Sequence, residues 1–276
     1  MKSFEIPETL TLDSAALFTV YLRLDPGGLS FSGYNTKEEG SYFFVKVVFD
    51  KDKPYLESLK DYFFSHEFLT YTYKKVFVIP FPSSYTLVPE EIYLPEEKEQ
   101  ILAFNFASKN GKALNNNCKE SQVEIVFDID RQVYEFCCRS LTNPQFIHPI
   151  RPLLRLWKKQ SQNCLPKQMY VILQKESMDI ACYERGQLLF ANSFGFEHSE
   201  DIIYYILYVW KQIDMNQLID QIRLTGEPTL CNQVLDRLQI YLQYIARIEL
   251  PAETYTFGPA LMQAPLDLIA LATCES

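Results

Sequence analysis

The hydrophobic and polar positions of the chain follow the same order of elements twice. In the first half, short runs rich in Val, Phe, Tyr and Leu are typical of strands, and one segment has the apolar spacing of an amphipathic helix. The pattern predicts strands at 17–25, 29–35, 41–50 and 74–81, with a helix at 54–66 before the last strand. Asp25-Pro26-Gly27-Gly28 is turn chemistry, so the first two strands are predicted to form a hairpin.

The second half repeats this order and extends it by a helix and a strand. Strands are predicted at 169–174, 178–186, 187–196 and 221–226, with a helix at 199–215 before the fourth strand. A last long helix is predicted from Thr229, because Leu230, Val234, Leu238, Leu242 and Ile245 form one apolar stripe. A closing strand is predicted at 247–252. Ser199 and Thr229 are predicted as the N-caps of the two helices.

The middle of the chain fits as the rest of the first half plus an insertion. The Asn-rich segment 108–121 is predicted to be a mobile hairpin or loop. A strand is predicted at 122–129, helices at 130–141 and 150–160, and a linker at 161–167. The sequence ends in a short apolar helix at about 263–273.

Three antiparallel strands joined to parallel strands through helices make the ribonuclease-H-like layout, an α/β arrangement with mixed sheets. Two copies in one chain predict the duplicated, two-lobed actin-like ATPase fold. We expect an N-terminal lobe at 1–162 with an insertion near 89–121, and a C-terminal lobe at 163–262. The C-terminal helix 263–273 is expected to pack back against the first lobe.

Two stretches carry a family resemblance. The run "LLFANSFGFEHSEDIIYYILYVWKQIDM" (188–215), then "IRLTGE" (222–227) and a terminal "CES", resembles the bacterial family called domain of unknown function 3822. The segment "VEIVFDIDRQVYEFCCRSLTNPQFIHPIRPLLRLW" (123–157) more distantly resembles the actin-like proteins of pilus assembly and type II secretion. The first resemblance implies a fold and no activity. The second implies a cytosolic scaffold that docks partners, a group in which some members bind ATP.

An actin-like ATPase needs three loops that hold nucleotide and Mg²⁺. At the first, Asp25, Gly27 and Gly28 match a metal-organising acid and a phosphate-binding turn, but Pro26 removes an amide donor. The alternative interpretation of this turn is an ordinary hairpin.

At the second loop, Gln174–Ser177 has no glycine, and Glu176 places a negative charge where phosphate would bind. At the third, Gly226 stands alone and is followed by Glu227 and Pro228, which also fits a simple strand-to-helix turn. The loops therefore favour a degenerate ATPase site, a pseudo-ATPase.

Several other activities are disfavoured. A net charge of −9 argues against a nucleic-acid partner. The seven cysteines contain no Cys-x-x-Cys pair, so neither a zinc site nor a disulfide framework is predicted. His66, His148 and His198 are interpreted as capping or surface residues. No apolar run approaches the length of a membrane span. Lobe two offers no carboxylate on its first strand for a nuclease metal site.

The predicted helix 199–215 is apolar nearly all round. Tyr204, Tyr205 and Tyr208 lie away from its main stripe. Packing between the sheet and a neighbouring helix would explain them. The alternative is a partner or self-association surface, because Tyr and Trp are enriched at interfaces.

Together these observations favour a non-catalytic, cytoplasmic binding or scaffold module with no cofactor, an unidentified protein partner, no direct membrane insertion and a possible homodimer. The alternative is a nucleotide-binding, kinase-like or ATPase protein with ATP and Mg²⁺ in the inter-lobe cleft. That alternative would use Asp25, Gly27, Gly28, Gly226 and Glu227.

Overall fold

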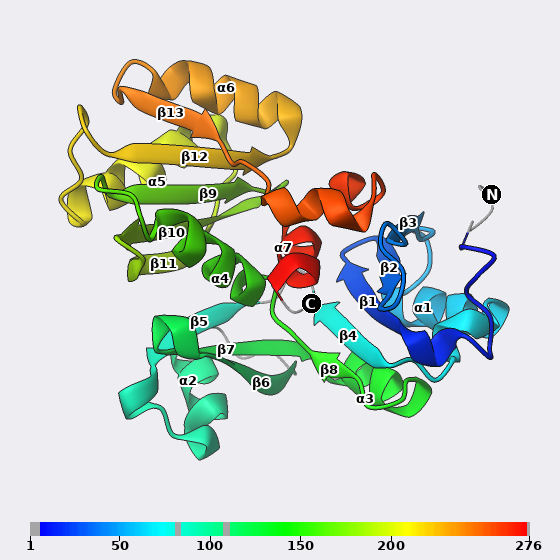
Figure 1. The fold of residues 1–276 in the computed structure, drawn as a ribbon. Helices are drawn as coiled ribbons and strands as arrows, with labels where there is room; N and C mark the ends of the chain where they lie inside the picture. Colours follow the sequence, from blue (N-terminus) through cyan, green and yellow to red (C-terminus); the bar gives the residue numbers. More distant parts are fainter. Residues whose placement is uncertain (1–5, 81–83, 107–110, 275–276) are drawn as a thin grey trace. The chain divides into compact units, whose positions relative to one another are not determined.

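The structure is a computed structural model that describes residues 6–80, 84–106 and 111–274. It divides into two compact units (Figure 1). Unit 1 contains the chain up to Asn117, then Glu124–Leu153 and the segment from Pro251 onward; unit 2 contains Cys118–Val123 and Leu154–Leu250. Residue 81 of the strand predicted at 74–81, the start of the segment 108–121 and the end of the "CES" motif lie outside the described residues.

Unit 1 is built on a five-stranded mixed sheet of strand order β3-β2-β1-β4-β8. Neighbours β1, β2 and β3 are antiparallel, whereas β4 runs parallel to β1 and β8 parallel to β4. The strands are β1 (Phe18–Asp25), β2 (Gly28–Asn35), β3 (Phe43–Val48), β4 (Lys75–Pro80) and β8 (Gln145–Phe146).

The two faces of this sheet are covered by different parts of the chain. Leu22 and its alternate neighbours in β1 join the core formed with helices α1 (Tyr55–Ser65) and α3 (Arg131–Ser140). Arg23 faces the opposite side, where it bonds Asp267 of helix α7 (Leu266–Cys274). This helix near the C-terminus, expected at 263–273, is part of unit 1 (Figure 1).

Unit 2 repeats the arrangement with strand order β11-β10-β9-β12-β13. Its first three strands are antiparallel to their neighbours, and β12 and β13 continue the sheet in parallel. The strands are β9 (Gln168–Leu173), β10 (Ser177–Glu184), β11 (Gln187–Gly195), β12 (Gln221–Gly226) and β13 (Tyr244–Arg247). The order and direction of the strands match those of unit 1, so the predicted duplicated ribonuclease-H-like α/β fold is confirmed.

Helices cover both faces of the second sheet. Helices α5 (Ser199–Gln212) and α6 (Pro228–Leu238) contribute to one core with the inward residues of β9, β10 and β12. On the other face, α4 (Ile150–Ser161) places Trp157 parallel to the ring of Tyr170, with 5.3 Å between centroids. The Tyr183 hydroxyl donates to the carbonyl of Leu154 at 3.0 Å. Unit 2 is therefore a three-layer structure.

Of the two structures predicted for the Asn-rich segment, the hairpin is found and the loop is wrong. From Gly111 to Cys118 the segment forms strand β6 of a small sheet with order β5-β7-β6, together with β5 (Tyr85–Pro89) and β7 (Val123–Asp130). Asparagine is depleted in strands, and this low strand propensity led to the wrong prediction of a loop. Tertiary hydrogen bonds override it: Asn116 donates to the Phe146 carbonyl at 2.9 Å and accepts from the His148 amide at 2.7 Å. Asn117 donates to Glu124 at 2.6 Å.

The predicted long last helix is also wrong. Helix α6 ends at Leu238, and Ile245 lies in β13, opposite Ile222. Leu242 is buried from a turn between them. The residues of the predicted apolar stripe therefore pack into the same core of unit 2, but they belong to different elements. The closing strand occupies 244–247 instead of 247–252.

Short elements complete the chain. Helix α2 (Lys98–Asn105) lies in the insertion of unit 1. The 3₁₀ turns are Ala15–Leu17, Glu67–Thr70, Glu90–Ile92, Pro95–Glu97, Lys119–Ser121, Ala252–Phe257 and Leu261–Gln263.

The role of Asn116 can be tested by Asn116→Ala, which leaves the Phe146 carbonyl and the His148 amide without their partner. We expect the free energy of unfolding to fall by about 2 kcal/mol. The matched control is Asn105→Ala, because Asn105 is exposed and, among the described residues, its side chain bonds the Ile101 carbonyl of its own helix. Its expected effect is within about 0.5 kcal/mol. Urea unfolding midpoints give both values, and equal midpoints would contradict a structural role for Asn116.

Candidate functional site

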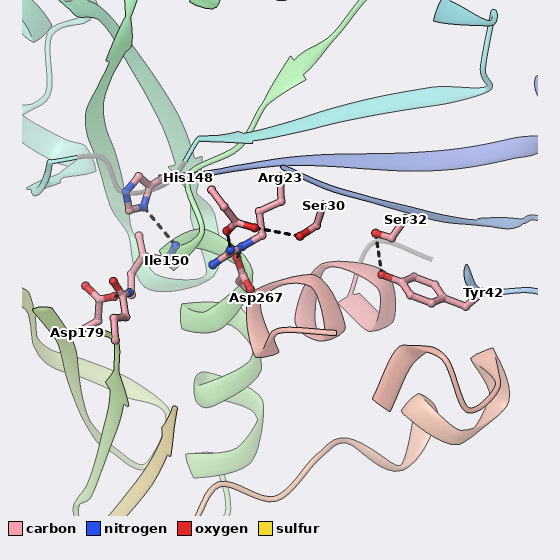
Figure 2. A network of polar contacts seen from close by, with 10 residues as sticks. Arg23, Ser30, Ser32, Tyr42, His148, Ile150, Asp179 and Asp267 are labelled. Carbon is pink, nitrogen blue, oxygen red and sulfur yellow. Dashed lines mark hydrogen bonds and ion pairs between the residues drawn. The ribbon is translucent and has the colours of Figure 1, made fainter. Parts of the chain in front are cut away.

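Asp25, the acid of the first predicted loop, is turned into the protein. Its side chain ends β1 and is only 10% exposed. One carboxylate oxygen accepts from the Ser30 hydroxyl at 3.0 Å, and the other forms an ion pair with the Arg23 guanidinium (Figure 2). The same guanidinium donates through Nε to Asp267 at 2.8 Å. Asp25 thus has a cation from its own strand.

This arrangement changes what the first loop can do. A carboxylate that organises Mg²⁺ needs oxygen lone pairs directed at the ion or its waters. Here two buried carboxylates share the guanidinium of Arg23, which presents several donors in a fixed plane. A second buried contact on the sheet joins the Tyr42 hydroxyl to Ser32 at 3.0 Å (Figure 2). Burial raises the pKa of Tyr42 well above its ordinary value, so this hydroxyl remains a donor.

Of the two glycines of the first loop, Gly28 has a structural explanation, and Gly27 has room for a Cβ. Gly28 faces β3, where an added Cβ would lie 2.0 Å from the carbonyl oxygen of Val47. Its own carbonyl accepts from the Tyr55 hydroxyl at 3.0 Å. The carbonyl of Gly27 accepts from the Phe49 amide at 2.8 Å. The hairpin turn is thus bonded to the segment after β3.

The second loop is a closed turn between β9 and β10. The Gln174 amide donates to the Ser177 carbonyl at 2.9 Å, and the Ser177 hydroxyl donates to the Gln174 side chain at 2.9 Å. Gln174 also donates to the carboxylate of Asp179 at 3.0 Å. Asp179 is 8% exposed and was not identified from the sequence. Its signal was a single acid inside the apolar run 178–183.

The third loop begins with a glycine that no other residue could replace without strain. Gly226 has φ +134°, and an added Cβ would lie 2.0 Å from the carbonyl oxygen of its strand partner Leu173. Close approach of β9 therefore explains this glycine.

Glu227 occupies the N-cap of α6. Its carboxylate accepts from the amides of Thr229 at 3.0 Å and Leu230 at 2.6 Å. The prediction that Thr229 is the N-cap was wrong, because α6 begins earlier, with Pro228 as its first residue and Glu227 as the N-cap. Hydrogen bonds from Leu230 and then Thr229 hold the pKa of Glu227 below its ordinary value. A helix N-terminus attracts anions, and here the chain supplies the anion itself.

Helix α5 begins in a similar way. His198, not Ser199, is its N-cap, and Asp201 accepts from the amides of Glu197 at 3.1 Å and His198 at 3.0 Å. Those bonds lower the pKa of Asp201. His148 is buried between the rings of Tyr85 and Phe127, and its Nδ1 accepts from Ile150 at 3.2 Å. It therefore caps α4, as one of the two interpretations had it, but it is not at the surface.

The five predicted nucleotide-site residues thus form two groups. Asp25, Gly27 and Gly28 share one hairpin of unit 1, whereas Gly226 and Glu227 lie at the β12–α6 junction of unit 2. Over residues 6–80, 84–106 and 111–274, no three His, Cys, Asp or Glu side chains are grouped closely enough to hold a metal ion.

A continuous line of aromatic rings runs from β11 onto α5, and we call it the aromatic ladder. Phe190 stacks on Phe194, with 6.3 Å between centroids, and Phe194 stacks on Tyr205 at 4.8 Å. Tyr204 meets Tyr205 edge-on at 5.4 Å and stacks on Tyr208 at 6.0 Å. Tyr204 and Tyr208 are 61% and 48% exposed, so the core does not account for them.

An open groove of about 740 Å³ adjoins the ladder. It lies between the β9–β10 turn, the end of β11 and the start of α5, and it is lined by Lys175, Glu176, Gly195, Phe196, Glu197, Asp201 and Tyr205. The lining contains three acidic residues and one lysine, and Lys175 lies 3.7 Å from Glu176. The groove is therefore acidic with aromatic walls, chemistry that favours a cationic group.

The structural explanation of the glycines can be tested by Gly226→Ala. It should lower the free energy of unfolding by about 3 kcal/mol, because the added methyl meets backbone and the φ is unfavourable. The matched control is Gly27→Ala, since nothing lies within 4 Å of a Cβ there. That variant should change stability by less than about 1 kcal/mol. Thermal unfolding measures both, and a neutral Gly226→Ala would contradict the strand-packing explanation.

The cap formed by Glu227 predicts a pH dependence. The pKa of Glu227 is lower in the folded than in the unfolded chain, so its charge stabilises the fold above the ordinary glutamate pKa of about 4.3. That contribution is lost as the pH falls through the lower folded pKa. Glu227→Gln should therefore lower the unfolding midpoint at pH 7, and the difference from the parent chain should shrink in acid. Glu184→Gln, on the exposed end of β10, controls for charge alone; a difference that stays constant with pH would count against the cap.

In the part of the chain that the structure describes, no helix is long and apolar enough to cross a membrane. No curated protein matches the chain. Among solved structures, a protein of Bacteroides thetaiotaomicron with an actin-like ATPase fold and unknown function is similar over 94% of this chain and 97% of its own, with 31% identity and a TM-score of 0.80. The PilM–PilN type IV pilus biogenesis complex contains a chain that is similar over 95% of this one and 100% of its own, with 12% identity and a TM-score of 0.53.

The second similarity extends to the fold alone, and the first supports the actin-like architecture of both units. The family described as protein of unknown function (DUF3822) matches residues 7–245, which is most of the sequence. The chain therefore belongs to the DUF3822 family.

Proposed function

We propose that this protein is a non-catalytic binding or scaffold module on the actin-like ATPase fold, in which the nucleotide loops have become structural. The observation that carries the proposal is the engagement of Asp25. Its buried carboxylate is bonded by Arg23 and Ser30, and Arg23 is held in turn by Asp267. A Mg²⁺ ion at Asp25 would have to displace a guanidinium that two acids hold.

The third loop supports the same proposal. The amides that begin α6 already bond the Glu227 carboxylate, so an anionic ligand there would compete with an intramolecular charge. Gly226 has its reason in the packing of β12 on β9. No feature of these loops requires a ligand for its explanation.

Binding to a protein is supported by the surface of unit 2. Tyr204 and Tyr208 stack on each other in solvent, where Tyr205 links them to β11. Exposed tyrosines in such continuous groups are typical of interfaces. A chain of the same fold occurs in the PilM–PilN complex, which supports a partner-binding role for this fold. The seven free cysteines fit a reducing, cytoplasmic location.

The proposal predicts that ATP with Mg²⁺ leaves the unfolding temperature unchanged. A ligand at about 100 times its Kd would add about 2.7 kcal/mol, which corresponds to a rise of about 5–10 °C. Differential scanning fluorimetry measures this, with an ATP-binding actin-like protein in the same buffer as the positive control.

Asp25→Ala separates the two roles of the acid. If Asp25 is structural, the variant unfolds at a lower temperature with or without nucleotide, with a loss of about 3 kcal/mol, because Arg23 keeps only one of its acids. If the parent chain shows a clear shift with ATP and Asp25→Ala abolishes it, the protein binds nucleotide and the proposal is overturned.

A further inference from the structure

Strand β11 is an open sheet edge, with one β-bulge near its start where Leu189 has no partner in β10. It lies at the end of its sheet and is nine residues long, the longest edge strand among the described residues. Its sequence, QLLFANSFG, has no charged residue and no proline. The edge strands β3, β5, β6 and β13 each contain a lysine, an arginine or a proline. Charges and prolines are a usual protection against strand pairing, and among the described edge strands only β11 and the two-residue β8 have neither.

The open side of β11 has a defined set of backbone groups. Phe196 donates to the Glu176 carbonyl at 3.1 Å, and the register pairs Phe194 with Met178 and Asn192 with Ile180. Hydrogen-bonded positions alternate along an antiparallel pair. Ala191, Ser193 and Gly195 therefore direct their N–H and C=O groups away from β10. The Ser193 amide is bonded by the side chain of its neighbour Asn192 at 2.9 Å, a contact that a pairing strand would replace.

We propose that a second copy of this chain pairs with β11 in antiparallel orientation, so that the two sheets become one. A twofold axis at Ala191, the midpoint of 187–195, gives the two strands their full overlap. Such an interface is self-complementary, because the same surface serves both copies. The aromatic ladder, which starts on β11 and reaches solvent on α5, lies beside this axis and gains a partner from the second copy.

Charge complementarity fixes this register. In an antiparallel pair centred on Ala191, the numbers of two residues that lie opposite each other add up to 382. Arg185 of one copy therefore lies opposite Glu197 of the second copy. Arg185 lies in the β10–β11 turn, and both side chains are exposed. Within the described residues, neither forms an ion pair in its own chain, so both charges are available.

The acidic groove provides the receiving site. It lies at the Glu197 end of β11, and its walls include Glu176, Phe196 and Tyr205. A guanidinium entering from the second copy would meet carboxylates at the rim and aromatic faces beside them, which suits the planar, charged group of arginine. The groove, the open edge, the exposed tyrosines and the unpaired arginine are thereby explained by one occupant.

This inference rests on the proposed binding role of the aromatic ladder and is independent of the state of the nucleotide loops. Size-exclusion chromatography with light scattering on the full chain, from low to high micromolar concentration, tests it. The expected mass is twice the 32.3 kDa of one chain. Ala191→Pro removes an outward amide and should raise the dimer dissociation constant by at least about tenfold. Ile240→Ser, at the exposed side chain near the opposite edge of the sheet, should leave it unchanged.

A charge exchange tests the register and remains informative if Ala191→Pro fails to fold. Arg185→Glu and Glu197→Arg should each weaken the dimer, because each sets like charges opposite one another. The double variant Arg185→Glu/Glu197→Arg should restore the parent dissociation constant to within about threefold. Circular dichroism and the unfolding temperature establish that each variant is folded.

The outcomes are distinct. A parent chain that is monomeric at every concentration, or a dimer that both single charge variants leave unchanged, overturns the inference. A double variant no better than the single variants overturns the register and the role of the groove. None of these results bears on the nucleotide loops, for which the proposal fails only if ATP and Mg²⁺ stabilise the chain through Asp25.

Discussion

The ion pair of Arg23 with two aspartates is the interaction on which unit 1 depends. It joins β1, which carries Asp25, to α7, which carries Asp267 and is otherwise almost entirely apolar. Removing charges from water costs free energy that only close pairing and further hydrogen bonds offset. Here Ser30 supplies one such bond. Burial of Asp267 on the C-terminal helix and burial of Asp25 at the end of β1 are therefore both compensated by one guanidinium.

The same physical rule governs unit 2. The N-terminus of a helix presents free amides and a positive partial charge, which external anions can satisfy. In α6 the carboxylate of Glu227 satisfies two of them, and in α5 the carboxylate of Asp201 lies in the first turn and bonds the amides of Glu197 and His198 just before the helix. With Arg23 in unit 1, the chain thus supplies the ionic partner of Asp25 and the anion at the start of α6 from its own side chains.

The order of strands and helices was predictable because each sheet buries alternate residues and each long helix buries one stripe. What failed were features set by contacts distant in sequence. Asn116 is a poor strand former that Phe146 and His148 hold in a strand. Glu227 caps α6 in place of the better cap former Thr229, because the helix begins at Pro228 and Thr229 already lies in its first turn. The partner of Asp25 could not be predicted, since Arg23 also suits a surface strand and Asp267 lies 242 residues from Asp25.

Because the fold is duplicated, corresponding strands of the two units can be compared, and differences between them come from the sequence. By topology, β11 of unit 2 corresponds to β3 of unit 1, since each is the third strand of its meander and an edge of its sheet. The fold therefore creates both open edges. Only β3 carries an exposed lysine, Lys46, whereas β11 has no charge over nine residues and is flanked by Arg185 and Glu197 of opposite sign. An uncharged edge with complementary charges at its two ends is thus a property of this sequence, and it is the pattern that antiparallel pairing of two identical strands requires.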